Sequence, residues 1–165
     1  MSFEEIRVVA VVYTAVLLPL VIYWKYKSRL PKWIPSFYII SLIVCALGWE
    51  LWFTYGWLDG DPVDIRRSDN LNIWLPKNIN WLLNSMGDAG AILLGGAWLM
   101  WITHNKNLMI FKRWNWTAFM VLYIWCVSQN IFVEMFLYHD QLADGKPLSW
   151  APLSPFGPYF NPVLF

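Results

Sequence analysis

The chain has 165 residues, of which 58% are hydrophobic, 19% aromatic and only 14% charged. Soluble proteins contain roughly 45–50% apolar and about 25% charged residues, so this composition argues against a water-soluble globule. The net charge of +1 gives no basic field of the kind that binds nucleic acid, so nucleic acid is not expected as a partner.

Four apolar stretches follow one another along the chain, at about 6–24, 35–58, 78–103 and 114–139. Each is about as long as the ~17–25 residues that a membrane-spanning helix requires. Pro19 lies inside the first stretch, where it predicts a kink. Glu4 and Glu5 stand where a cleavable signal peptide would carry basic residues, so we interpret this stretch as a retained span. We therefore predict an all-α, polytopic membrane domain over residues 1–139, built as a bundle of four transmembrane helices.

The last residues, 140–165, have a different composition. Prolines at 147, 152, 155, 158 and 162 remove too many backbone donors for a fifth helix. The segment is nevertheless too rich in aromatic and aliphatic residues for a disordered linker. We predict an ordered, non-helical tail on the outer membrane surface, acting as a lid or as a docking arm for membrane-protein partners.

The distribution of charge predicts the topology. Two short connections hold seven of the twelve Lys and Arg residues and no acid, and by the positive-inside rule both face the cytoplasm. The N-terminus, the connection near residue 60 and the tail carry most of the acids. We therefore predict that both termini lie on the non-cytoplasmic side. The seven cations are Lys25, Lys27, Arg29, Lys32, Lys106, Lys112 and Arg113.

Three acids are the candidate catalytic residues. Glu50, Asp88 and Glu134 are each the only charge in the second, third and fourth spans, where an ionisable side chain costs at least ~2.5–3.5 kcal/mol near the bilayer centre. All three fall in the outer half of their spans. Polar residues accompany them at helical spacing, and small residues over 87–97 would let the helices approach closely. These polar residues, which we take as substrate-binding candidates, are Thr54, Asn80, Asn84, Asn130 and Tyr138.

We expect the three acids to share one pocket. Intramembrane acids can instead simply hydrogen-bond to neighbouring amides and set the register of the helices. Because the sequence places no cation at their depth, we expect at least one acid to be protonated near neutral pH. A protonated carboxyl can protonate an alkene or an epoxide, and a second carboxylate can then remove a proton. The residues therefore permit isomerisation or cyclisation of an isoprenoid or sterol-like lipid, with no cofactor and no metal.

The order of a first span, a basic connection and a second span ending in VCALGWELWFTY resembles the start of the integral-membrane terpene cyclases of fungal meroterpenoid pathways. The second helix of that family carries a Trp-Glu pair with the Glu proposed as an acid, which implies Trp49 and Glu50 as site residues here. The resemblance covers about the first third of the chain. That family has seven helices, and its other essential acid lies in a late helix without a counterpart here, so Glu134 would have to substitute for it.

Sterol-isomerase-like membrane proteins, which are small bundles with buried acids, offer a second analogy. They also use an intramembrane His, whereas His104 and His139 fall at opposite membrane faces of this chain.

The segment DGDPVDIRRSDN places Asp59, Asp61 and Asp64 close together but breaks the spacing of a calcium-binding EF-hand loop. We expect Arg66 and Arg67 to pair with these aspartates or to meet a lipid headgroup. Cys45 and Cys126 lie inside predicted helices, belong to no Cys-x-x-Cys pair, and are expected to be packing residues.

Two other functions remain open. The protein could be a non-catalytic subunit of a larger membrane complex, with its tail and outer connection docking a partner. It could also carry protons or ions, but no matching polar path continues inward from Asp88, so this alternative ranks last.

Overall fold

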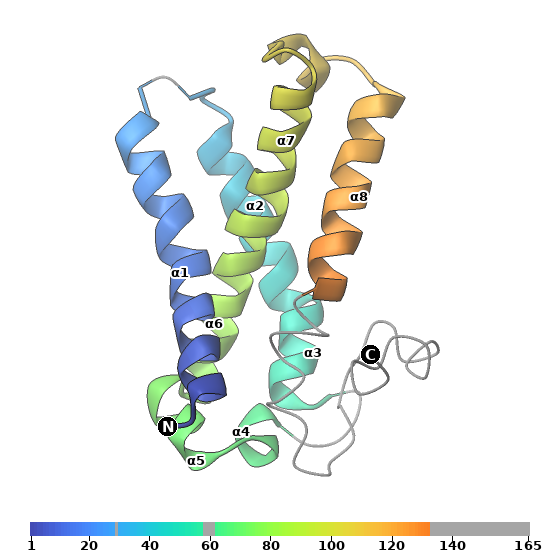
Figure 1. The fold of residues 1–165 in the computed structure, drawn as a ribbon. Coiled ribbons are helices and arrows are strands. Elements are labelled where there is room, and N and C mark those ends of the chain that lie inside the picture. The colour runs from blue at the N-terminus through green and yellow to red at the C-terminus, as the bar shows by residue number, and fades with distance from the viewer. Residues whose placement is uncertain (29, 58–61, 133–165) are drawn as a thin grey trace.

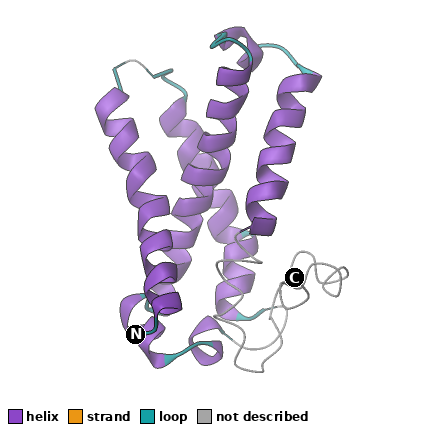
Figure 2. Cartoon of the chain, in the orientation of Figure 1, coloured by secondary structure: helices purple, strands orange, loops and turns teal. Residues whose placement is uncertain are grey.

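The structure, a computed structural model, describes residues 1–28, 30–57 and 62–132, and all regular structure in these residues is helical (Figure 2). Three helical segments are long and apolar enough to cross a membrane, namely Glu5–Tyr26, Ile34–Tyr55 and Lys77–Thr103. They coincide with the first three predicted spans. Of the fourth, α8 (Trp116–Phe132) is described, and its apolar part, Trp116–Gln129, is shorter. The rest of that span and the predicted tail lie outside the described residues.

The first span is one helix, α1 (Phe3–Tyr26), which continues through Pro19. Ser2 begins it with a capping box. The Ser2 hydroxyl accepts a 3.2 Å hydrogen bond from the Glu5 amide, and the Ser2 amide donates a 2.7 Å bond to the Glu5 carboxylate. These reciprocal bonds satisfy backbone donors that a helix start would leave without partners.

The second and third spans are each interrupted near a candidate acid. In the second span, α2 (Ile34–Leu47) ends at Gly48 and α3 (Trp49–Tyr55) begins directly after it. The third span consists of α6 (Lys77–Gly87), the π-helix η1 (Asp88–Leu94) and α7 (Gly95–Thr103). Breaks and π-helical turns of this kind re-aim side chains and are frequent at functional sites.

The third span is the centre of the fold. In Figure 1 it crosses the molecule between α1, α2 and α8, and its segments pack against all three of these helices. Small residues make this possible: a Cβ at Gly90 would lie 2.9 Å from the Pro19 ring, and a Cβ at Gly95 3.5 Å from the Trp125 ring. The expectation that the small residues of 87–97 allow close helix approach is therefore supported.

Neighbouring side chains also donate hydrogen bonds to backbone carbonyls of this central span. The Tyr38 hydroxyl donates to the Met86 carbonyl at 3.4 Å, and the Trp125 indole N–H donates to the Ile92 carbonyl of η1 at 3.0 Å. These bonds attach α2 and α8 to the central span through polar contacts as well as apolar packing.

At one end of the bundle, residues 62–76 form a structure that we call the cap. It contains α4 (Val63–Arg66) and α5 (Asp69–Trp74), and the N-terminus lies beside it (Figure 1). A core of buried residues joins the cap to α1, made of Val8, Val12, Leu71 and Leu75. The connections that follow α1 and α7 lie at the opposite end, where η2 (Leu108–Phe111) is a short 3-10 helix.

Away from the cap, the spans expose large apolar side chains. Leu17 and Val21 on α1, and Ile40 and Val44 on α2, are each more than half exposed. An apolar surface on helices of this length suits contact with lipid. These helices therefore suggest a membrane location.

Candidate functional site

Glu50 lies on the buried face of α3. It is 5% exposed and shares its face with Phe53 and Thr54, which follow it at positions i+3 and i+4 and are also buried. Gly48 sets the direction in which α3 leaves α2, because a Cβ at this position would lie 2.7 Å from the carbonyl oxygen of Val44. The break at Gly48 thus presents the Glu50 face to the interior of the bundle.

Asp88 is the first residue of η1. Its amide donates to the carbonyls of both Asn84 and Ser85, which is where the α-helical pattern changes to the wider π-helical one. η1 packs against α1 and α2 on one side and against α7 and α8 on the other. Asp88 therefore stands where the central span meets its neighbours.

Glu50 and Asp88 belong to segments that pack against one another. α3, which carries Glu50, packs against α6, and Asp88 follows the end of α6 as the first residue of η1. η1 in turn packs against α2, the helix that precedes α3. Two of the three predicted acids, which are far apart in the sequence, are thus brought to the same part of the interior.

The structure also brings two cations into the interior that the sequence analysis placed elsewhere. Arg66 and Arg67 of the cap are 3% and 6% exposed. Arg66 donates a 2.6 Å hydrogen bond to the Phe53 carbonyl and lies over the Phe53 ring, 5.1 Å from its centroid. Because Phe53 follows Glu50 by one helical turn, this guanidinium lies against the same face of α3 as the Glu50 carboxyl.

Arg67 binds the central span and the cap itself. It donates to the side-chain oxygens of Asn72 at 2.8 Å and Asn80 at 3.0 Å, and to the carbonyl of Leu75. The sequence analysis expected the two arginines to pair with the nearby aspartates or to meet a lipid headgroup; the structure buries both, and the charge of Arg67 acts on Asp64. Buried guanidinium groups need several acceptors, and Asn72, Asn80 and the Leu75 carbonyl supply them for Arg67.

The salt bridge of Asp64 is instead with Lys77, at 2.9 Å. Burial raises the pKa of the Asp64 carboxyl, but the hydrogen bond from Lys77 and the charges of Lys77 and Arg67 outweigh it, so the pKa lies below its ordinary value. This ion pair joins α4 to the start of α6, outside the apolar part of the third span.

The predicted substrate-binding residues divide between two environments. Asn80 is buried and accepts the bond from Arg67, and Thr54 is completely buried on the face of α3 that carries Glu50. Asn84, one turn before Asp88, and Trp49, beside Glu50, are half-buried. Asn80 and Thr54 therefore belong to the packed junction of the cap, whereas Asn84 and Trp49 flank the two acids.

The fourth helix contributes less to the described site. Asn130 lies near the end of α8, and the predicted acid Glu134 and its companion Tyr138 lie outside the described residues. α8 itself packs against α7 and η1. In the part of the chain that the structure describes, no group of three or more His, Cys, Asp or Glu side chains could hold a metal ion.

The sequence analysis did not predict that Arg66 and Arg67 would be buried inside the fold. Their burial depends on contacts with Phe53 and Asn80, each thirteen residues away from its arginine. Neither periodicity nor a motif indicates such contacts. The only available signal was the set of amide side chains that follows the arginine pair, at Asn70, Asn72, Asn78 and Asn80.

Comparison of the chain with known protein families, with curated proteins and with solved structures gives no match.

Proposed function

We propose that this protein is a membrane-embedded enzyme that uses intramembrane carboxyl groups for acid/base isomerisation or cyclisation of a hydrophobic isoprenoid or sterol-like lipid. The observation that supports the proposal best is that Glu50 is buried in α3, that α3 packs against α6, and that Asp88 stands at the end of α6. Each stands beside an interruption of its span, at Gly48 and at the start of η1. An interruption of a helix changes the direction of the side chains beside it, so that an acid there can face a ligand. On an uninterrupted helix the regular geometry fixes the direction of each side chain.

The proposed reaction consumes no co-reactant. One carboxyl donates its proton to an alkene or epoxide of the lipid, which forms a carbocation, and the other carboxyl takes a proton from a neighbouring carbon to restore a double bond. The proton then passes from the second carboxyl back to the first, so that atoms and charge balance and both groups return to their starting protonation states. Glu134 would supply a third acid from the fourth span.

Activity on a lipid extract tests this proposal. The purified protein is incubated with the extract, and the products are separated and identified by mass and by double-bond position. Glu50→Gln and Asp88→Asn keep the shape of each side chain but remove its proton chemistry, so each should abolish turnover. The matched control is Asp69→Asn, because Asp69 is an exposed acid of the cap and should leave turnover unchanged. Full turnover by both site variants would refute the proposed chemistry.

A second candidate function is that of a non-catalytic subunit of a larger membrane complex. It is supported by the contacts of Arg66 and Arg67, in which buried polar groups such as Asn80 hold the cap against the spans. We call these contacts the arginine junction. A subunit should co-purify with fixed partners and should unfold or aggregate without them, whereas an enzyme should be stable and active alone. Docking would use the predicted tail, residues 140–165, and the outer connection.

We further propose that the cap and the N-terminus lie on the non-cytoplasmic side. Support comes from their position at the opposite end from the two basic connections. A glycosylation or reporter fusion at the N-terminus tests the orientation.

A further inference from the structure

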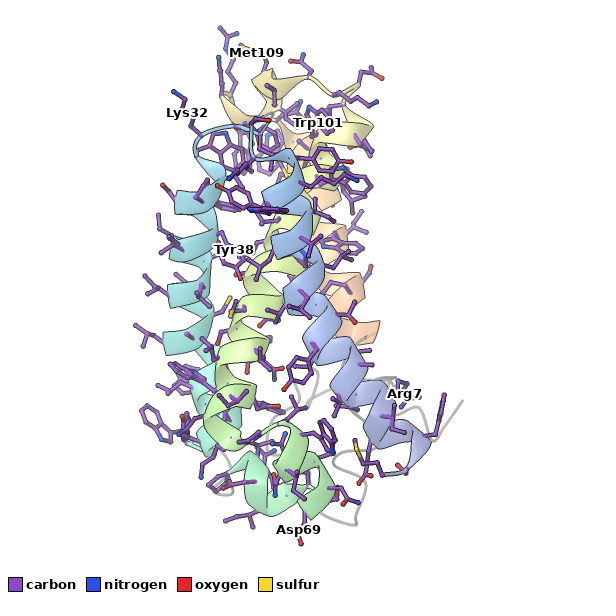
Figure 3. All side chains as sticks on the ribbon, turned by 90° about the vertical axis from the view of Figure 1, so that its left-hand side faces the viewer. Arg7, Lys32, Tyr38, Asp69, Trp101 and Met109 are labelled. Atoms are coloured by element: carbon purple, nitrogen blue, oxygen red, sulfur yellow. The ribbon has the colours of Figure 1, made fainter. Side chains whose placement is uncertain are left out.

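The end of the bundle opposite the cap carries a concentration of exposed cations. We call it the basic end and define it by Lys25, Lys27, Lys32, Lys106, Lys112 and Arg113, all of which are exposed. In the described residues none of these six side chains forms a salt bridge. Figure 3 places Lys32 at this end, together with Met109, and shows Arg7 and Asp69 at the other.

An aromatic contact joins the two basic connections. The rings of Trp33 and Phe111 lie with their centroids 5.3 Å apart, and Trp33 also contacts Phe37 at the start of α2. Lys32 precedes Trp33 in the sequence, and Lys112 follows Phe111. The ring contact therefore brings together cations from two connections that are about eighty residues apart in the chain.

The backbone of the basic connection that follows α7 is held in an unusual conformation. Asn105 and Lys106 have positive φ values, 54° and 60°, which residues other than glycine seldom adopt. The Lys106 amide donates to the Trp101 carbonyl at 2.9 Å, and the Asn107 side chain accepts from the Met109 amide at 2.9 Å. A connection that is fixed by these bonds holds Lys106 in a defined place at the basic end, at some conformational cost.

The surroundings of these cations match the headgroup region of a membrane. Trp114 and Trp116 are 66% and 69% exposed and contact each other edge to face, with ring centroids 5.1 Å apart. Exposed indoles beside the ends of apolar helices are typical of the membrane interface. Exposed cations at that level are complementary to phosphate oxygens.

We propose that the basic end binds the headgroup of an anionic phospholipid, between the connections that the Trp33–Phe111 contact holds together. Lys32 and Lys112 supply the charge on either side of the ring pair, and Lys106 and Arg113 extend it. The ligand is a lipid of the surrounding leaflet because the cations stand at the ends of apolar helices, where an acyl chain can continue along the exposed surface. This binding does not depend on any chemistry at Glu50 and Asp88.

Lipid retention measures the binding. The purified protein is equilibrated with equal amounts of phosphatidylglycerol and phosphatidylcholine in detergent, and the lipids that stay bound are quantified by native mass spectrometry. The wild-type protein should retain phosphatidylglycerol preferentially. Lys32→Gln combined with Lys112→Gln should lower this preference by about fivefold for each cation removed, whereas Lys32→Arg combined with Lys112→Arg should keep it.

A charge-conserving variant distinguishes a built site from simple attraction by net charge. Phe111→Leu retains every cation but removes the ring contact that joins the connections, so it should also lose most of the preference. Circular dichroism of each variant in phosphatidylcholine checks that the helices are intact. Equal retention of both lipids by the wild type, or an unchanged preference in Phe111→Leu, would overturn the proposal. Displacement of the lipid by millimolar inorganic phosphate would assign the site to free phosphate and overturn it equally.

Discussion

The guanidinium of Arg67 donates a 3.0 Å hydrogen bond to the side-chain oxygen of Asn80, which joins the cap to the central span. Both residues are buried, and Arg67 also binds Asn72 and the Leu75 carbonyl. The cap is thus attached through a cation with several acceptors, and not through apolar packing alone.

Replacement of Arg67 by Met should therefore destabilise the protein strongly. Hydrogen bonds to charged groups contribute about 1.5–3 kcal/mol each, and their loss here leaves three acceptors without this donor, of which those on Asn80 and Leu75 are buried, so we expect a loss of at least about 2 kcal/mol. Unfolding in detergent, followed by circular dichroism, measures it. Arg113→Met is the matched control, since Arg113 is exposed and should change stability by less than about 0.5 kcal/mol. Equal effects of the two substitutions would show that the junction contributes nothing.

Gly90→Ala should loosen the packing of α1 on the central span. The new Cβ would lie 2.9 Å from the Pro19 ring, and a proline ring in a helix has little freedom to move away. We expect a loss of about 1–3 kcal/mol, as for other overpacked sites. Gly95→Ala is the control, because its Cβ would make an ordinary 3.5 Å contact with Trp125 and should be neutral or slightly stabilising. Thermal unfolding measures the stability of both variants. A larger loss of stability in Gly95→Ala than in Gly90→Ala would contradict this account.

Gly48→Ala should disturb the junction of α2 and α3 more than a comparable change elsewhere. Its Cβ would stand 2.7 Å from the Val44 carbonyl oxygen, which belongs to the backbone, so relief requires a movement of α3 and of Glu50 with it. At Gly96 the obstructing group is the flexible end of Leu122, which can rotate away. The melting temperature should therefore fall further for Gly48→Ala than for Gly96→Ala. The opposite order would mean that α2 and α3 tolerate a side chain at their junction.

The Asp64–Lys77 salt bridge should make stability depend on pH only in acid. Burial raises the pKa of Asp64, but the Lys77 hydrogen bond and the nearby cations lower it further, to below its ordinary value of 3.8. The pair therefore contributes fully above that ordinary value, and the contribution disappears as the pH falls through the lower pKa of the folded protein. Both side chains are about one-third exposed, so the contribution should be at most ~1 kcal/mol.

Asp64→Asn tests this dependence through melting curves recorded between neutral and strongly acid pH. The variant should be less stable than the wild type at neutral pH and equally stable once Asp64 is protonated. A constant difference at all pH values would show that the effect of the substitution is steric and not electrostatic.

The sequence by itself determined the features that depend on local composition. The lengths and apolarity of the first three spans, and the single acids Glu50 and Asp88 within the second and third, follow from the order of residues, because a helix in lipid must be long, apolar and satisfied by its own backbone bonds. The small residues of the third span similarly indicated close helix approach, which the contacts of Gly90 show. These predictions needed no knowledge of which helix lies beside which.

Only the tertiary structure decided where the polar side chains of the cap would go. Arg66 and Arg67 belong to a hydrophilic segment that reads as an exposed loop, yet they are buried because α3 and α6 bring carbonyl and amide acceptors around them. The break at Gly48 and the π-helix that begins at Asp88 also appeared only in the structure. A buried charge is stable only when distant parts of the chain supply its partners, and that condition cannot be read from a local pattern of residues.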